Sequence, residues 1–198
     1  MSAAFLSCIP FVLAEEGGLS TDPGDPGNWT GGSVGGGECL GTNFGIASAD
    51  YQSFLAALPA SVAATMPATV ASLTVAQAQT IYQSLFWTPI QGDQLPLALA
   101  MVMLDAAVNS GVSQSGMWLQ TVIGVATDGV IGPETLASVK SWIAARGTPT
   151  TASATGDLCA EVIAQRIAAL GTDPDFSTFG LGWSRRCAAL AFQAATMS

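Results

Sequence analysis

The hydrophobic residues of this chain recur mostly at helical spacing, so the pattern predicts a mainly α protein. The first apolar segment, AAFLSCIPFVLA at residues 3–14, is expected to form a core helix that Pro10 starts or distorts. A capping Thr precedes one later segment, and Pro or Gly closes several others. The further predicted helices are residues 48–58, 74–87, 96–111, 113–123, 133–146, 157–170 and 177–195.

The segment 96–111, PLALAMVMLDAAVNSG, differs from the others because it is apolar nearly all round until Gly111. A helix of this kind is buried on every side, so we expect it to be the central helix of the fold. It is too short to cross a bilayer and it contains Asp105, so no membrane insertion is expected.

The stretch 15–46 interrupts the helical pattern with EEGGLSTDPGDPGNWTGGSVGGGECLGTNFGI. It holds 11 of the 22 glycines, and its strand signals predict only a small hairpin within residues 28–46. Carboxylates gather where the first helix gives way to turns, and active sites often lie in such loops. Residues 60–73 and 147–155 are expected to be connecting segments without regular structure.

Composition and charge argue against a disordered protein and against one class of partner. A hydrophobic content of 49% with 10% charged residues argues against disorder, and 198 residues are enough for a real core. The net charge is −9, and no Lys or Arg precedes Lys140. Phosphate binding needs clusters of Lys and Arg, so the charge argues against a nucleic-acid partner.

The chain contains no histidine, which removes Ser–His and Cys–His nucleophilic sites and the usual zinc sites. No CxxC pair occurs, which argues against an all-cysteine zinc site, and the carboxylate chemistry considered below needs neither a metal nor a cofactor. Two states of the cysteines remain open: disulfides Cys8–Cys39 and Cys159–Cys187, or free buried thiols. The N-terminal segment lacks the basic residues of a signal peptide, so the sequence indicates no export route.

Carboxylates are the catalytic groups that remain. Glycoside hydrolysis needs one carboxyl kept protonated as an acid and a second carboxylate that activates water or stabilises the cation. Glu16 ends an apolar helix, and we expect it to be partly desolvated beside Glu15, Asp22 and Asp25. Asp25 lies in a solvated turn and is expected to be ionised. The alternative, that DPGDPG is only a polar turn, stays open from spacing alone.

Several motifs together resemble one enzyme family. EGGLSTDPGDPGNWTGG followed by GTNFGI resembles the EGGY…DPxDPGG…TxxGI signature of the phage- and secretion-associated N-acetylmuramidases of glycoside hydrolase family 108. QTIYQSLFW, LDAAVNSG and FGLGWSRR resemble further segments of that family, and ATDGVIGPETL resembles the DGxxGPxT element of its peptidoglycan-binding-like region. The likeness spans nearly the whole chain in the same order.

The resemblance implies a lysozyme-like α domain with a small Gly-rich hairpin lobe and a helical C-terminal subdomain. Residues 1–111 would be the catalytic region and residues 112–198 a peptidoglycan-binding-like region. The implied activity is hydrolysis of the β-1,4 bond between N-acetylmuramic acid and N-acetylglucosamine in the bacterial wall, outside the cytoplasm. A lytic transglycosylase and a non-catalytic wall-binding or virion protein are the alternatives.

Within that family the catalytic glutamate is the one in EGG, which is Glu16 here. Asp25 would position the attacking water with help from a threonine. A Gly-rich insertion separates Thr30 from Thr42, and either of them could be this threonine.

The expected partner is a peptidoglycan glycan strand bound by a monomer. Trp29 is expected to stack on a sugar ring and Asn43, in TNFGI, to contact substrate. Tyr82 either stacks on sugar or belongs to the core. Asp105 and Asn109, one helical turn apart, either line the cleft floor or tie the buried helix to the carboxylate loop.

Overall fold

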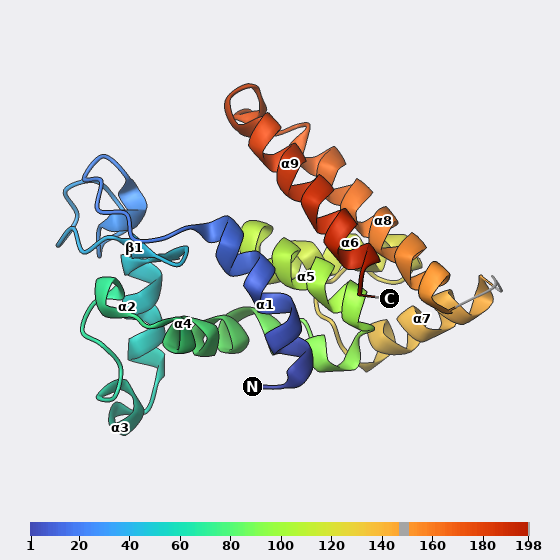
Figure 1. Ribbon diagram of the computed structural model, residues 1–198, viewed down its shortest axis with the longest axis horizontal. Helices are drawn as coiled ribbons and strands as arrows, with labels where there is room; N and C mark the ends of the chain where they lie inside the picture. Colours follow the sequence, from blue (N-terminus) through green and yellow to red (C-terminus); the bar gives the residue numbers. More distant parts are fainter. Residues whose placement is uncertain (147–150, 198) are drawn as a thin grey trace. The chain divides into compact units, whose positions relative to one another are not determined.

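Helices make up most of the structure, a computed structural model that describes residues 1–146 and 151–197 (Figure 1). The predicted mainly α class is confirmed. The chain forms two compact units. We call Leu13–Tyr82 the loop unit, and Met1–Val12 with Gln83–Ser198 the helical unit. The predicted functional regions 1–111 and 112–198 follow different limits from these units and stay a prediction.

The loop unit contains the only sheet in the part of the chain that the structure describes, a hairpin of β1 (Thr42–Asn43) and β2 (Ile46–Ala47). Its second strand runs one residue beyond the predicted range of 28–46. The helices of this unit, in chain order, are the end of α1 (Ala3–Glu16), η1 (Pro26–Asn28), α2 (Ser48–Ala57), α3 (Ala60–Ala63), η2 (Val70–Ser72) and α4 (Val75–Tyr82). The segment 60–73, predicted to lack regular structure, therefore contains two short helices.

The start of α4 follows from its sequence. The Thr74 hydroxyl accepts a hydrogen bond from the Gln77 amide at 3.3 Å, and the Gln77 side chain accepts one from the Thr74 amide at 3.0 Å. This reciprocal capping box satisfies two backbone donors that a helix start leaves unpaired. The helix predicted to run to Trp87 changes at Gln83 into a π-helical turn, η3 (Gln83–Trp87).

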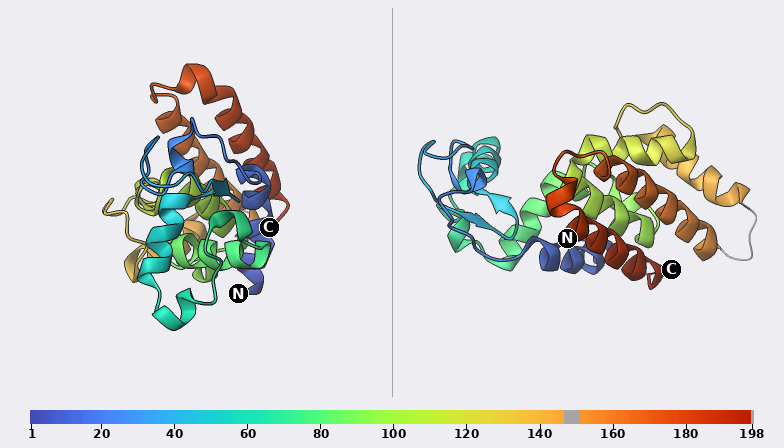
Figure 2. Two further views of the ribbon diagram at one scale, coloured as in Figure 1. Left: turned by 90° about the vertical axis from the view of Figure 1, so that its left-hand side faces the viewer. Right: turned by 90° about the horizontal axis from the view of Figure 1, so that it is seen from above.

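The helical unit is built around α5 (Leu97–Ser110), in which every residue from Ala98 to Ala107 is buried. The helices α6 (Val112–Ile123), α8 (Thr151–Leu170) and α9 (Phe176–Ala195) pack on it, and α8 and α9 lie side by side in each view (Figure 2). The prediction of a central buried helix is therefore confirmed. The remaining elements of the helical unit are the first part of α1, the π-helical turn η3, η4 (Gly92–Gln94) and α7 (Pro133–Ala145).

Three expectations need correction. Helix α1 passes through Pro10 and does not start there. Helix α8 begins at Thr151, inside the segment 147–155 that was predicted to be a loop, while residues 147–150 lie outside the described residues. All four cysteines are free thiols, so the disulfide alternative is wrong in this structure.

Burial raises the pKa of the Cys8 and Cys159 thiols to about 12, so both are expected to stay protonated and unreactive near neutral pH. No described helix is both long and apolar enough to pass through a membrane.

Candidate active site

Glu16 is the last residue of α1 and lies half-buried, whereas its neighbour Glu15 is exposed. The helix ends here because Gly17 takes a left-handed conformation, with φ of +74°, which glycine adopts without steric cost. The expected partial burial of Glu16 is present, and Glu16 is the more buried of the two glutamates.

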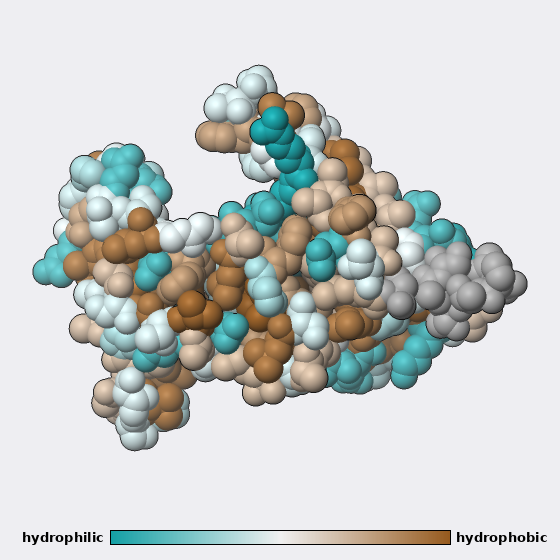
Figure 3. Space-filling model, viewed as in Figure 1, coloured by the Kyte–Doolittle hydropathy of each residue, from teal (hydrophilic) through white to brown (hydrophobic). Residues whose placement is uncertain are grey.

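The DPGDPG segment forms two successive turns that follow from its repeated sequence. The Gly24 amide donates to the Asp22 carboxylate at 2.8 Å, and the Gly27 amide donates to the Asp25 carboxylate at 2.9 Å. Such contacts are the usual reason for Asp at the start of a turn. Asp25 is exposed, as predicted, and it caps the first turn of η1. Hydrophilic residues cover this part of the loop unit (Figure 3).

Asn28, which the sequence reasoning did not select, anchors this loop. It is fully buried, and its side-chain amide donates to the Asp22 carbonyl at 2.8 Å. The Asn28 backbone carbonyl accepts a hydrogen bond from the Gly41 amide at 3.0 Å, which ties the DPGDPG turns to the residue before β1. Asn between Gly and Pro residues is typical of a turn at the surface, so nothing in the local sequence indicates that Asn28 is buried.

The two threonine candidates lie in different surroundings. The Thr42 hydroxyl oxygen and an Asp25 carboxylate oxygen lie 3.6 Å and 3.3 Å from the point where a Cβ on Gly27 would stand, so both flank the same glycine. The Thr30 hydroxyl accepts a hydrogen bond from the Glu38 amide at 3.0 Å, and it would lie 2.2 Å from a Cβ on Gly37. Thr42 and Asp25 therefore both lie against Gly27, while Thr30 closes the glycine-rich loop.

The hairpin turn touches Glu16. Phe44 and Gly45 connect the paired residues Asn43 and Ile46, with φ of 52° and 72°. Positive φ at both central residues defines a type I′ turn, which suits the twist of a two-residue hairpin. A Cβ built on Gly45 would lie 2.6 Å from Oε2 of Glu16 and 2.8 Å from its Cβ, so the Glu16 side chain lies against the backbone of this turn.

Contacts from outside the hairpin hold the same turn. The Tyr82 hydroxyl donates to the Phe44 carbonyl at 2.7 Å, and the Asn43 side-chain amide donates to the Val70 carbonyl at 3.0 Å. Both side chains are buried, with 1% of Tyr82 and 6% of Asn43 exposed. The structure thus gives each a contact that supports the loop unit, and a contact of either residue with substrate stays a prediction.

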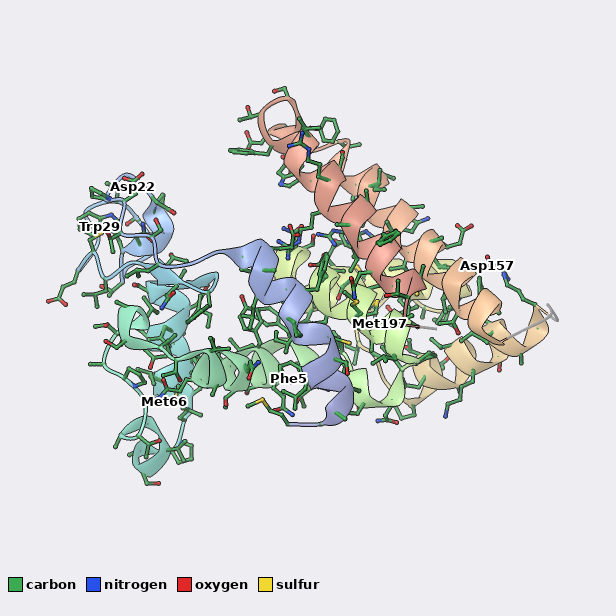
Figure 4. The ribbon with its side chains drawn as sticks, viewed as in Figure 1. Phe5, Asp22, Trp29, Met66, Asp157 and Met197 are labelled. Atoms are coloured by element: carbon green, nitrogen blue, oxygen red, sulfur yellow. The ribbon has the colours of Figure 1, made fainter. Side chains whose placement is uncertain are left out.

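Trp29 is the aromatic residue of this loop that we predicted to bind substrate. It is half-buried, and its indole N–H donates to the Pro23 carbonyl at 2.9 Å. Trp29 and Asp22 lie together in the same loop (Figure 4). The hydrogen bond fixes the edge of the indole ring. Stacking of the ring on a sugar stays a prediction.

Asp105 belongs to the helical unit and is fully buried between two arginines. It lies 2.5 Å from Nη1 of Arg166 on α8 and 2.8 Å from Nη2 of Arg186 on α9. Asn109 accepts a hydrogen bond from Arg166 at 2.9 Å. These contacts tie α5 to α8 and α9, and sequence reasoning missed both arginines. Because Asp105 has no exposed surface, we revise its predicted place on a cleft floor. Asn109 is exposed and stays a substrate-binding prediction.

The DGVIGPET element forms a turn held by buried Gln120 of α6. The Gln120 side chain donates to the Asp128 carboxylate at 2.7 Å and accepts from the Gly129 amide at 2.8 Å. The pKa of Asp128 lies below its usual value because the Val130 amide, first, and then Gln120 donate to its carboxylate. A cavity of about 220 Å³ adjoins this turn and the start of α7.

Comparison with known proteins decides the family. The model of the family described as Glycosyl hydrolase 108 matches residues 9–111, which include Glu16, Asp25 and Thr42. The chain belongs to glycosyl hydrolase family 108. The predicted resemblance is thereby confirmed, and membership makes the protein a glycoside hydrolase.

The fold of this family 108 hydrolase has a solved counterpart over nearly its whole length. The structure of SagA from Brucella abortus is similar with a TM-score of 0.74 and 31% sequence identity, covering 98% of this chain and 95% of SagA. The predicted lysozyme-like fold is confirmed by this likeness. No curated protein matches the chain. Within residues 1–146 and 151–197, no group of three His, Cys, Asp or Glu side chains is placed to hold a metal ion.

Proposed function

We propose that this family 108 hydrolase is an N-acetylmuramidase that cleaves the β-1,4 bond between N-acetylmuramic acid and N-acetylglucosamine in peptidoglycan. The observation that carries the proposal is the placement of Glu16, half-buried against the Phe44–Gly45 turn in the unit that also presents exposed Asp25. One sheltered carboxyl and one solvated carboxylate are the two groups that glycoside hydrolysis requires.

Glu16 is the general acid of this mechanism and protonates the leaving glycosidic oxygen. Partial burial supports this assignment, because a half-buried side chain has less freedom to move than an exposed one. The turn backbone against Glu16 also restricts where its carboxyl can lie, so the proton is presented from a fixed direction. Glu15, exposed on the preceding position, has neither feature.

Asp25 positions and activates the attacking water on the opposite face of the sugar. Its turn fixes the carboxylate through the Gly27 amide, and its exposure leaves the group open to solvent. Thr42 is the better of the two threonine candidates, because its hydroxyl flanks the same glycine as the Asp25 carboxylate. A water-mediated attack of this kind inverts the anomeric configuration.

The remaining assignments complete the proposal. Trp29 contacts a sugar ring, and the protein acts on glycan strands of the bacterial wall as a monomer without a cofactor. Residues 112–198 form a second region that binds the wall.

Mass spectrometry of digested sacculi tests the reaction. The proposal expects muropeptides that end in reducing N-acetylmuramic acid, and proton NMR of the first product should show the inverted α-anomer. Products that end in 1,6-anhydro-N-acetylmuramic acid would instead identify a lytic transglycosylase. An Asp25→Asn protein should bind sacculi normally and release no product, because only the water-activating carboxylate is lost.

A further inference from the structure

The Phe44–Gly45 turn is strained at its first residue. Phe44 has a φ of 52°, a left-handed conformation that side chains other than Asn, Asp and Gly rarely adopt. Among the described residues only Phe44 and Gln91 are non-glycine residues with positive φ. Type I′ turns usually place Asn, Asp or Gly at this position. Such a conformation persists only where surrounding contacts hold it.

The contact that holds Phe44 comes from the far end of the loop unit's sequence. Tyr82 is the last residue of α4, it is 1% exposed, and its hydroxyl donates to the Phe44 carbonyl at 2.7 Å. The hydrogen bond fixes the orientation of the peptide group that joins Phe44 to Gly45. Tyr82 therefore acts directly on the turn backbone and not through a neighbouring side chain.

Glu16 lies on the other residue of the same turn. A Cβ on Gly45 would stand 2.6 Å from Oε2 and 2.9 Å from Cγ of Glu16, so the carboxyl group rests on the Gly45 backbone. A rotation of the Phe44–Gly45 peptide would move this surface. The contacts thus form a short path from the Tyr82 hydroxyl, through one peptide group, to the carboxyl of Glu16.

We infer that Tyr82 is a positioning residue of the reaction, whose hydroxyl holds the turn on which the acid Glu16 rests. This inference rests on the proposed function and replaces the sugar-stacking assignment of Tyr82. The tyrosine acts through the turn and touches no reacting atom. Its loss should therefore lower the rate of the chemical step and leave substrate affinity nearly unchanged.

The chain supplies a matched control in its other tyrosine. Tyr51 is also buried, with 0% exposed, and its hydroxyl also donates to a backbone carbonyl, that of Pro67, at 2.7 Å. Tyr82→Phe and Tyr51→Phe therefore each remove one buried hydroxyl and its hydrogen bond to a backbone carbonyl of the same unit. Only Tyr82→Phe releases the turn that touches Glu16.

The experiment compares the two variants by thermal denaturation and by initial rates on soluble peptidoglycan fragments. We expect similar decreases in Tm, a kcat about 10-fold lower for Tyr82→Phe with KM unchanged, and wild-type kcat for Tyr51→Phe. Equal kcat values in the two variants would overturn the inference, as would a rise in KM without a fall in kcat, which would instead indicate a substrate contact.

A third variant separates this inference from the proposed function. Glu16→Gln should be inactive whether or not Tyr82 holds the turn in place. If Glu16→Gln keeps wild-type activity, the proposed function itself fails. If it is inactive while Tyr82→Phe and Tyr51→Phe behave alike, only the positioning inference fails.

Discussion

Replacing Gly45 with Ala tests whether the turn backbone is the surface on which Glu16 works. The substitution adds a single methyl group, and its Cβ would lie 2.6 Å from the Glu16 carboxylate oxygen. Carbon and oxygen atoms in ordinary contact lie about 3.5 Å apart, so the carboxyl must move by about 1 Å. A displacement of that size can lower the rate of a positioned reaction about 100-fold.

The same substitution also strains the backbone. Gly45 has a φ of +72°, where a side chain costs about 1–2 kcal/mol. For a chain of this length each kcal/mol lowers Tm by about 2–4 °C, so backbone strain alone should lower the Tm of Gly45→Ala by about 2–8 °C. The expected result is a modest loss of stability together with a large loss of kcat.

Gly124→Ala is the control for the stability that is lost through backbone strain alone. Gly124 has a φ of +74°, and nothing lies within 4 Å of its added Cβ, so the variant carries the strain without the clash. Its Tm should fall to a similar extent while kcat on soluble peptidoglycan fragments stays at the wild-type value. Wild-type kcat in Gly45→Ala, at a matched loss of Tm, would refute the reasoning.

Three further predictions concern other parts of the chain. Asp105→Asn should lower the free energy of unfolding by about 3–5 kcal/mol in urea titrations, since it leaves buried Arg166 and half-buried Arg186 without their carboxylate, and an unchanged midpoint would contradict this. In native protein at pH 8, Ellman's reagent should modify half-buried Cys39 far faster than Cys8 or Cys159, whose thiol pKa is about 12, and four thiols should titrate in guanidinium. Because the folded-state pKa of Asp128 is lowered, its contribution to stability is present above the ordinary Asp pKa of 3.8 and is lost as the pH falls through the lowered value. Asp128→Ala should therefore lose less Tm on acidification than the wild type, and equal losses would argue against the Asp128 contacts.

The features of the fold that sequence predicted are those set by local pattern. Helix α5 was predictable because its residues are apolar nearly all round, and the start of α4 because Thr74 is a favoured N-cap residue. The start of α8 was missed because TASAT, rich in small polar residues, has no hydrophobic period. The π-helical turn after Tyr82 likewise has no local signature.

In the candidate site, too, the sequence predicted some features and missed others. Glu16 and Asp25 were selected from motif and position, and the structure places the first half-buried and the second exposed. The contacts around them come from distant parts of the sequence and were missed. Tyr82, on a separate helix, donates a hydrogen bond to Phe44. Phe44 lies in a turn at a positive φ, and Phe is not a residue type that predicts such a turn.

The most direct test of the central claim compares two adjacent glutamates. Glu16→Gln and Glu15→Gln each replace one carboxyl at the end of α1 by an amide of the same size, but only the first removes the carboxyl that rests on the Phe44–Gly45 turn. Release of reducing ends from purified sacculi should fall to background with Glu16→Gln and stay near the wild-type rate with Glu15→Gln. Wild-type release by Glu16→Gln, or loss of release only with Glu15→Gln, would contradict the account.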